Sequence, residues 1–239
     1  LELILRVIAG PDGRDPYISA APLRDSRAIE LAGLRVAWHS DNGIYTPTDE
    51  IRSVTEAAAL SLGEAGAKLT EIVPPPIPDT NEALIKLFVW NDDGGEWIRR
   101  LLDAAGTETP SPAIAVQINP DLRLGGDVIV ERIEARDRFR AAMVAFMADY
   151  DVLVTPVTGF PAPPYGQAED DALFPGYSYT QVYNLAGLPA AVVRCGTSPE
   201  GLPIGVQIAA PPWREDLALA VARHLEAEFG GWQAPPLGS

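Results

Sequence analysis

The chain has 239 residues, of which 33 are acidic and 18 are basic, so its formal net charge at pH 7 is −15. This acidic balance opposes non-specific binding to nucleic acid, which needs a basic surface, and we expect no nucleic-acid partner. No apolar run reaches the roughly 18 residues that a membrane helix needs, and one cysteine, Cys195, excludes an internal disulfide. The sequence therefore predicts a cytoplasmic protein with no membrane partner.

The first residues are apolar at helical spacing from Leu1 to Ile8, and Gly10-Pro11 ends the pattern. No residue stands ahead of Leu1 to cap such a helix. We expect residues 1–16 to be the end of a truncated helix followed by a turn.

Residues 33–73 predict a βαβ unit. Residues 34–38 and 68–73 are each expected to form a strand, and residues 49–65 between them predict a helix with acidic residues in its first turn. A strand, a helix and a strand at this spacing indicate parallel pairing. The prolines of residues 74–78 predict a stiff, extended linker after it.

Residues 79–150 predict a helical region. A long helix is expected over 81–105, kinked or split at the Gly-Gly pair 94–95. Residues 107–126 are rich in proline and glycine and predict a loop with one short helix. The clearest helical pattern runs over 128–150.

Residues 151–239 predict a strand, a hairpin and a final helix. The strand is expected at 152–154, the hairpin from apolar runs at 190–193 and 204–208, and the helix at 214–229. Together these elements predict an α/β fold with a mixed, mostly parallel sheet flanked by helices.

The sequence lacks the motifs of a self-contained hydrolase. It has no Gly-x-Ser-x-Gly elbow, no Gly-rich phosphate loop, and no His-x-x-x-His or Cys-x-x-Cys spacing. We therefore assign no catalytic residue and expect no metal and no cofactor.

Three motifs in order carry a family resemblance. Thr155-Pro156 ends a strand, the run 184–190 reads Asn-Leu-Ala-Gly-Leu-Pro-Ala, and the run 201–207 reads Gly-Leu-Pro-Ile-Gly-Val-Gln. This order resembles the carboxyl-terminal half of the amidase signature family, and residues 7–16 are similar to the segment that follows that family's catalytic core.

The resemblance implies a hydrolase that cleaves the C–N bond of a carboxamide through an acyl-serine intermediate. The family's two serines and lysine lie in a Gly/Ser-rich region that has no match here. We expect residues 1–239 to be the carboxyl-terminal part of a single, incomplete amidase-like domain that is inactive alone. Its expected partners are a small amide substrate, an amino-terminal segment with the catalytic core, and a second copy in a homo-oligomer.

The resemblance also implies a substrate-binding wall. The expected residues follow the 152–154 strand or precede the Asn-Leu motif: Thr155, Pro156, Thr158, Phe160, Tyr179, Thr180 and Asn184. Loops at the carboxyl ends of parallel strands line clefts in α/β sheets, which supports this independently. The alternative is structural: Asn184 bonds its own loop and Thr155-Pro156 ends a strand. Trp90 and Asn91 are further pocket candidates.

Two other functions stay open from the sequence. One is a catalytically dead module of the same fold that binds a small molecule or a partner. The other is an esterase or a transamidase subunit, because the shared motifs do not specify the leaving group.

Overall fold

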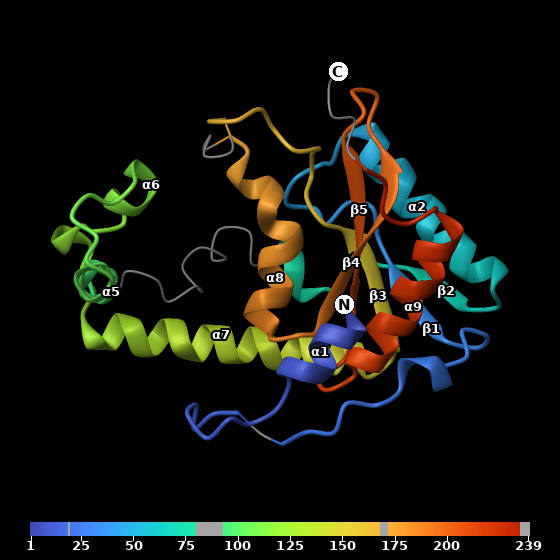
Figure 1. Cartoon of the computed structure of the whole chain (residues 1–239), viewed down its shortest axis with the longest axis horizontal. Coiled ribbons are helices and arrows are strands. Elements are labelled where there is room, and N and C mark those ends of the chain that lie inside the picture. Colours follow the sequence, from blue (N-terminus) through green and yellow to red (C-terminus); the bar gives the residue numbers. More distant parts are fainter. Residues whose placement is uncertain (19, 80–92, 168–171, 235–239) are drawn as a thin grey trace.

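The computed structural model describes residues 1–18, 20–79, 93–167 and 172–234, and its centre is one five-stranded sheet (Figure 1). The strand order is β2-β1-β3-β5-β4. The strands are β1 (Arg35–Trp38), β2 (Lys68–Glu71), β3 (Val152–Pro156), β4 (Ala190–Thr197) and β5 (Pro203–Ala209).

The sheet is mixed. β1 pairs in parallel with both β2 and β3, whereas β5 is antiparallel to both β3 and β4. Four strands therefore run one way and β5 alone runs the other way, which confirms the predicted α/β class with a mixed, mostly parallel sheet. The predicted hairpin is β4–β5, with a register irregularity between Arg194 and Gly196.

The predicted βαβ unit is present. α2 (Asp49–Glu64) connects β1 to the parallel strand β2, and its first turn contains Asp49 and Glu50. These two carboxylates lie where the helix dipole favours negative charge.

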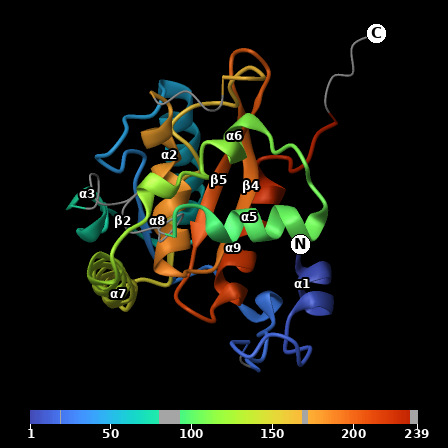
Figure 2. The same cartoon turned by 90° about the vertical axis from the view of Figure 1, so that its left-hand side faces the viewer.

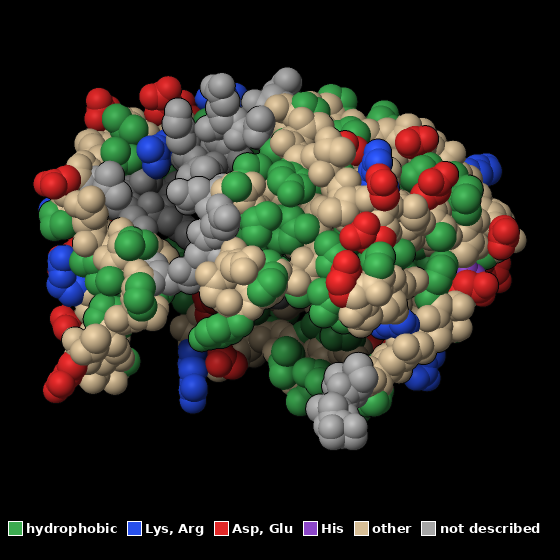
Figure 3. Space-filling view, turned by 90° about the horizontal axis from the view of Figure 1, so that it is seen from above, with side chains coloured by type: hydrophobic (Ala, Val, Ile, Leu, Met, Phe, Trp, Pro, Cys, Tyr) green, Lys and Arg blue, Asp and Glu red, His purple; other side chains and the backbone are tan. Residues whose placement is uncertain are grey.

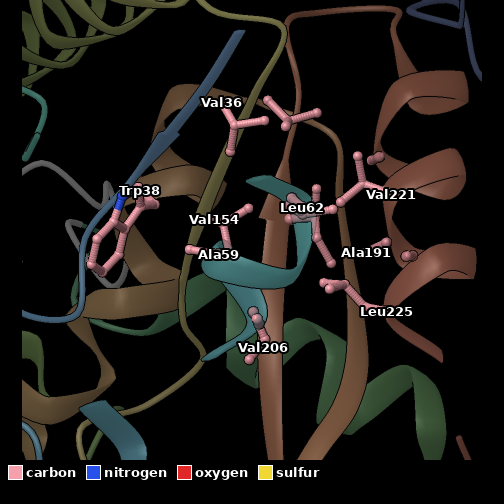
Figure 4. Packing of buried hydrophobic residues seen from close by; sticks show 14 of the residues in the cluster. Val36, Trp38, Ala59, Leu62, Val154, Ala191, Val206, Val221 and Leu225 are labelled. Atoms are coloured by element: carbon pink, nitrogen blue, oxygen red, sulfur yellow. The ribbon is translucent and has the colours of Figure 1, made fainter. Parts of the chain in front are cut away.

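Helices cover both faces of the sheet. Successive apolar side chains of a strand point to opposite faces, so each face carries its own hydrophobic core. Val36 and Val154 face α2 and α9 (Glu215–Glu228), and Figure 4 shows them packing toward Leu62 and Leu225. Ala37, Leu153 and Ala209 face α7 (Gly126–Met147) and α8 (Ser178–Ala186) on the other side. Each fully buried aliphatic side chain contributes roughly 1.5–3 kcal/mol from the removal of apolar surface from water.

Residues 74–78 differ from the predicted extended linker. α3 (Pro76–Asp79) is a single helical turn, in which the Ile77 amide donates to the Pro74 carbonyl at 3.0 Å. Proline is tolerated in the first turn of a helix, and the turn places Ile77, which has 0% exposure, in the core with α7. The prediction was wrong because this burial outweighed the extended preference of a proline run.

The predicted helix over 81–105 falls partly on residues 80–92, which lie outside the described residues. The described part, α5 (Glu96–Ala105), begins after Gly95, whose φ of 79° is left-handed, so the helix does not extend back through the predicted Gly-Gly pair. The following loop contains two short turns, α6 (Pro112–Ala115) and η2 (Pro120–Leu122).

α5 and α6 form an arm at the amino end of α7, beyond the part of α7 that packs on the sheet (Figures 1 and 2). The buried residues of α7 lie in its carboxyl-terminal half, and α5 has none, with Trp97 and Leu101 exposed. α1 (Glu2–Ile8) likewise has no buried residue. Across the described residues, no helix combines the length and the hydropathy needed to cross a membrane.

The helix α8 was not predicted from the sequence. Its residues include β-branched and aromatic side chains, which are weak helix formers. Tyr179, Val182, Tyr183 and Ala186 nevertheless recur on one face, and all are buried. Gly187, with a φ of 69°, ends the helix.

Candidate functional site

The carboxyl ends of β1 and β3 lie side by side because the two strands are parallel neighbours. Trp38 is paired with Val154, and the His39 amide donates to the Val154 carbonyl at 3.2 Å. The loop of residues 39–48 follows β1, and the segment after β3 precedes η3 (Phe174–Tyr177) and then α8. These parts gather at the upper end of the sheet in Figure 1, and hydrophobic side chains are prominent near the middle of this face in Figure 3.

Gln207 connects β5 to β3 and α8. Its Nε2 donates to Thr155 Oγ1 at 3.1 Å and to the Tyr179 carbonyl at 2.9 Å. Thr155 Oγ1 in turn donates to the Pro156 carbonyl at 3.0 Å. Gln207 and Thr155 are buried, so these bonds are shielded from competing water.

Tyr179 and Asn42 connect α8 to the 39–48 loop. The Tyr179 hydroxyl accepts from the Asn42 amide at 3.1 Å and donates to the Tyr45 carbonyl at 2.7 Å. Asn42 Nδ2 donates to Ser178 Oγ at 2.8 Å, and Asn42 Oδ1 accepts from the Ile44 amide at 2.9 Å. We call Asn42, Thr155, Ser178, Tyr179 and Gln207 the buried polar network; each is at most 3% exposed.

His39 lies beside this network and is uncharged at neutral pH. Burial lowers the pKa of His39 from 6.5 to about 4, although the nearby Asp41 opposes the shift. Its Nε2 lies 3.4 Å from the Tyr183 hydroxyl, and Nδ1 has no hydrogen-bond partner among the described residues. Burial also raises the pKa of the Tyr183 phenol well above its usual range, so the pair is neutral.

Three aromatic rings pack above the network. Tyr45 meets Phe160 edge-on at 5.9 Å between ring centroids, and Phe160 meets Tyr177 edge-on at 5.3 Å. We call Tyr45, Phe160 and Tyr177 the aromatic trio. A Cβ on Gly159 would collide with the Tyr45 ring, and one on Gly176 would collide with Phe160, so both glycines allow the rings their positions.

Six of the seven predicted wall residues lie in this region. Thr155 and Tyr179 belong to the network, Pro156 ends β3, and Phe160 is in the trio. Thr158 Oγ1 donates to the Phe160 carbonyl at 2.6 Å, and Thr180 Oγ1 donates to the Tyr177 carbonyl at 3.2 Å.

The structure does not bring Asn184 to the other six. It is exposed near the carboxyl end of α8, where its carbonyl accepts from the Gly187 amide at 3.2 Å. This helix end leads to Ala190, which pairs with Ala209 at the far end of β5, near the start of β3. The candidates Trp90 and Asn91 lie outside the described residues.

Sequence reasoning did not select His39, Asn42, Tyr45 or Gln207. A signal existed for the first three, because they follow a strand whose parallel neighbour is β3, and such loops meet at one edge.

The two described hollows lie away from the network. One of about 820 Å³ lies beside β4 and α9, with Val192, Leu219 and Trp232 in its wall. The other, of about 390 Å³, is bordered by Gly187 and Trp213 near the far end of α8. Neither touches the aromatic trio, so we base the site on the converging side chains rather than on the size of a hollow.

The network is suited to neutral hydrogen bonding. It contains no charged group, and Ser178 Oγ accepts from Asn42 Nδ2. Lys68 lies at the start of β2, at the opposite end of the parallel strands. In the described ranges, no three His, Cys, Asp or Glu residues lie close enough together to hold a metal ion.

Known proteins agree with the family resemblance. A family model described as amidase matches residues 1–219. The acylamidase of Rhodococcus erythropolis is 31% identical over 247 residues, covering 94% of this chain and 49% of that protein. A glutamyl-tRNA(Gln) amidotransferase subunit of Acidobacterium capsulatum is 29% identical, with 94% and 52% covered.

The fold of the chain also resembles that of solved structures. The structure of 6-aminohexanoate cyclic dimer hydrolase superposes with a TM-score of 0.82 at 21% identity, covering 95% of this chain and 52% of that one. The chain thus spans about half the length of the proteins that it matches. Because the family model covers most of the sequence and a relative above 30% identity agrees with it, the chain belongs to the amidase family, the amidase signature enzymes.

Proposed function

We propose that this chain is the carboxyl-terminal part of an amidase-type hydrolase and supplies walls of its substrate pocket. In the reaction, a serine oxygen attacks the carboxamide carbon, the C–N bond breaks, and the amine leaves with a proton. Water then hydrolyses the acyl-serine ester. The serines and the lysine belong to an amino-terminal segment, and residues 1–239 form one domain together with it.

The observation that carries this proposal is the convergence at the carboxyl ends of β1 and β3. Six family-matched residues lie there, beside the buried polar network, which is uncharged and connects β3, β5, α8 and the 39–48 loop. An uncharged network of this kind supports a pocket wall for a neutral amide but does not activate a nucleophile. Thr158 and Phe160 stay our candidates for direct contact, and Asn184 stays a prediction without support from this convergence.

The test compares the 239-residue chain alone with the same chain joined to the segment that its coding sequence carries upstream of Leu1. We expect hydrolysis of a simple aryl amide only by the joined protein. Turnover by the isolated chain would contradict the proposal. Binding of a small carboxamide by the joined protein without turnover would instead favour the catalytically dead module.

A second candidate is an amidotransferase component, which the similarity to the glutamyl-tRNA(Gln) amidotransferase of Acidobacterium capsulatum favours. In that case the ammonia released from an amide passes to a partner protein instead of to solvent. The discriminating measurement is ammonia release with and without candidate partner proteins, beside ester hydrolysis as the assay for an esterase. We further propose a cytoplasmic location and self-association; fractionation of the source cells and light scattering test these two points.

A further inference from the structure

Tyr179 connects three parts of the structure through one buried residue. Its hydroxyl accepts a hydrogen bond from the Asn42 backbone amide and donates one to the Tyr45 carbonyl, both in the 39–48 loop. Its own carbonyl accepts a hydrogen bond from the side chain of Gln207 on β5. With 0% exposure, the Tyr179 side chain does not contact solvent, so water does not replace these bonds when the hydroxyl is removed.

The loop that Tyr179 holds carries the first ring of the aromatic trio. The Tyr45 carbonyl accepts from the hydroxyl, and the Tyr45 ring packs against Phe160. The loop is also tied to the segment after β3, because the Thr48 amide donates to the Gly159 carbonyl at 3.0 Å. The Gly159 amide in turn donates to the Gly176 carbonyl at 3.0 Å, next to Tyr177.

The trio therefore has a common support. Its three rings come from three segments that are distant in sequence, and each segment is bonded to its neighbour through the backbone. Such aromatic rings can stack against a further flat ring or meet it edge-on.

We propose that Tyr179 is a positioning residue, whose hydroxyl fixes the 39–48 loop so that the aromatic trio forms a rigid wall for an aryl group of the amide substrate. This proposal rests on the proposed function, and it assigns Tyr179 an indirect role in place of direct contact with substrate. Loss of the hydroxyl loosens the wall without touching the reacting atoms.

The first test is kinetic and uses the joined protein with Tyr179→Phe. We expect the KM for an anilide to rise about tenfold while kcat changes less than about twofold, because the lost interaction orders the wall and not the chemistry. The KM for acetamide, which has no group that reaches the wall, stays the same. Tyr150→Phe is the matched control, since this tyrosine stacks on Phe146 at the end of α7, away from the network.

Equal changes with anilide and acetamide would assign Tyr179 a purely structural role and overturn the proposal. So would an unchanged anilide KM, or the same rise in Tyr150→Phe.

The second test does not depend on activity. The Asn42 amide donates to the Tyr179 hydroxyl and the Tyr45 amide donates to Asn42 Oδ1, so both report on the loop. Tyr179→Phe removes both hydrogen bonds of the hydroxyl. We therefore expect amide hydrogen–deuterium exchange at residues 42–45 to be faster by about tenfold or more in this variant. Exchange in β1 and β3 should not change, and Tyr150→Phe should leave the loop protected.

The two tests separate the two proposals. If the unmutated joined protein hydrolyses no amide, the proposed function fails and the substrate role of Tyr179 fails with it, whereas exchange still decides whether the hydroxyl holds the loop. If Tyr179→Phe does not fold, Ser178→Ala removes the acceptor of Asn42 Nδ2 and should loosen the same residues. Unchanged exchange in a folded variant would overturn the proposal.

Discussion

His39 should make the protein sensitive to mild acid. Its ring is buried, and this burial lowers the pKa of His39 from 6.5 to about 4 in the folded state. Between these two pH values the unfolded chain binds a proton that the folded chain does not bind. The free energy of unfolding should therefore fall as the pH drops from 6.5 towards 4, and His39 should have no effect above that window.

The size of the effect follows from the same pKa. The difference between 6.5 and about 4 corresponds to about 3 kcal/mol at about 1.4 kcal/mol for each pH unit. At pH 4.5 most of this loss, about 2–3 kcal/mol, should be present. Asp151 contributes below this window: burial raises the pKa of its carboxyl, but the hydrogen bonds from Arg35 outweigh burial and lower the pKa below its ordinary value.

The assay is urea unfolding, followed by tryptophan fluorescence at several pH values between 7.5 and 4.5. His39→Gln removes the histidine contribution and should flatten the pH dependence by about 2–3 kcal/mol, while leaving the part that carboxylates cause. His224→Gln, which changes the other histidine of the chain, should retain the steep dependence. Equal pH dependence in the unmutated protein and in His39→Gln would refute the reasoning.

Three further predictions concern stability and reactivity. Leu225→Ala should lower the free energy of unfolding by about 2–5 kcal/mol because the side chain has 0% exposure, whereas Leu60→Ala, at 51% exposure, should change it by less than about 0.5 kcal/mol; urea unfolding checks both. Gly196→Ala should cost about 1–3 kcal/mol in the same assay, because its Cβ would collide with a valine of α2. Gly126→Ala, which meets nothing within 4 Å, should be neutral or stabilise slightly, and a result of the opposite order would contradict the packing argument. Cys195, which is buried and whose pKa burial raises to about 12, should react with iodoacetamide far more slowly in the folded protein than in urea, and rapid labelling of the folded protein would show that the thiol is accessible.

The sequence predicted well those elements whose apolar residues follow a regular strand or helix pattern. β1 and β3 are short apolar runs, and α2 and α9 have one apolar face each, so their local pattern agrees with their tertiary environment. The β4–β5 hairpin was marked by turn residues between two such runs.

The elements that were missed depend on contacts distant in sequence. α8 forms because Tyr179 and Tyr183 are buried between the sheet and its neighbours, a fact that helix propensity does not contain. The turn at Pro76 forms because Ile77 enters the core beside α7. In both cases burial outweighs a local preference.

In the candidate site, too, residues in local motifs were predicted, whereas residues that depend on distant contacts were missed. Thr155, Phe160 and Tyr179 were accessible through family motifs, and the structure places them together. Asn42 and Gln207 were not singled out, because the bonds that connect them to α8 join residues more than 25 positions apart in sequence.

The position of Gln207 in the middle of an antiparallel strand has one more consequence. Successive side chains of a strand point to opposite faces, so slippage of β5 by a single residue would turn the amide away from Thr155 and point an aliphatic neighbour, Val206 or Ile208, at the threonine instead. The register in which β5 pairs with β3 therefore also determines the shape of the wall. An insertion within β5 should therefore disturb the buried core and the wall together, whereas one at the tip between Ser198 and Gly201 should spare both.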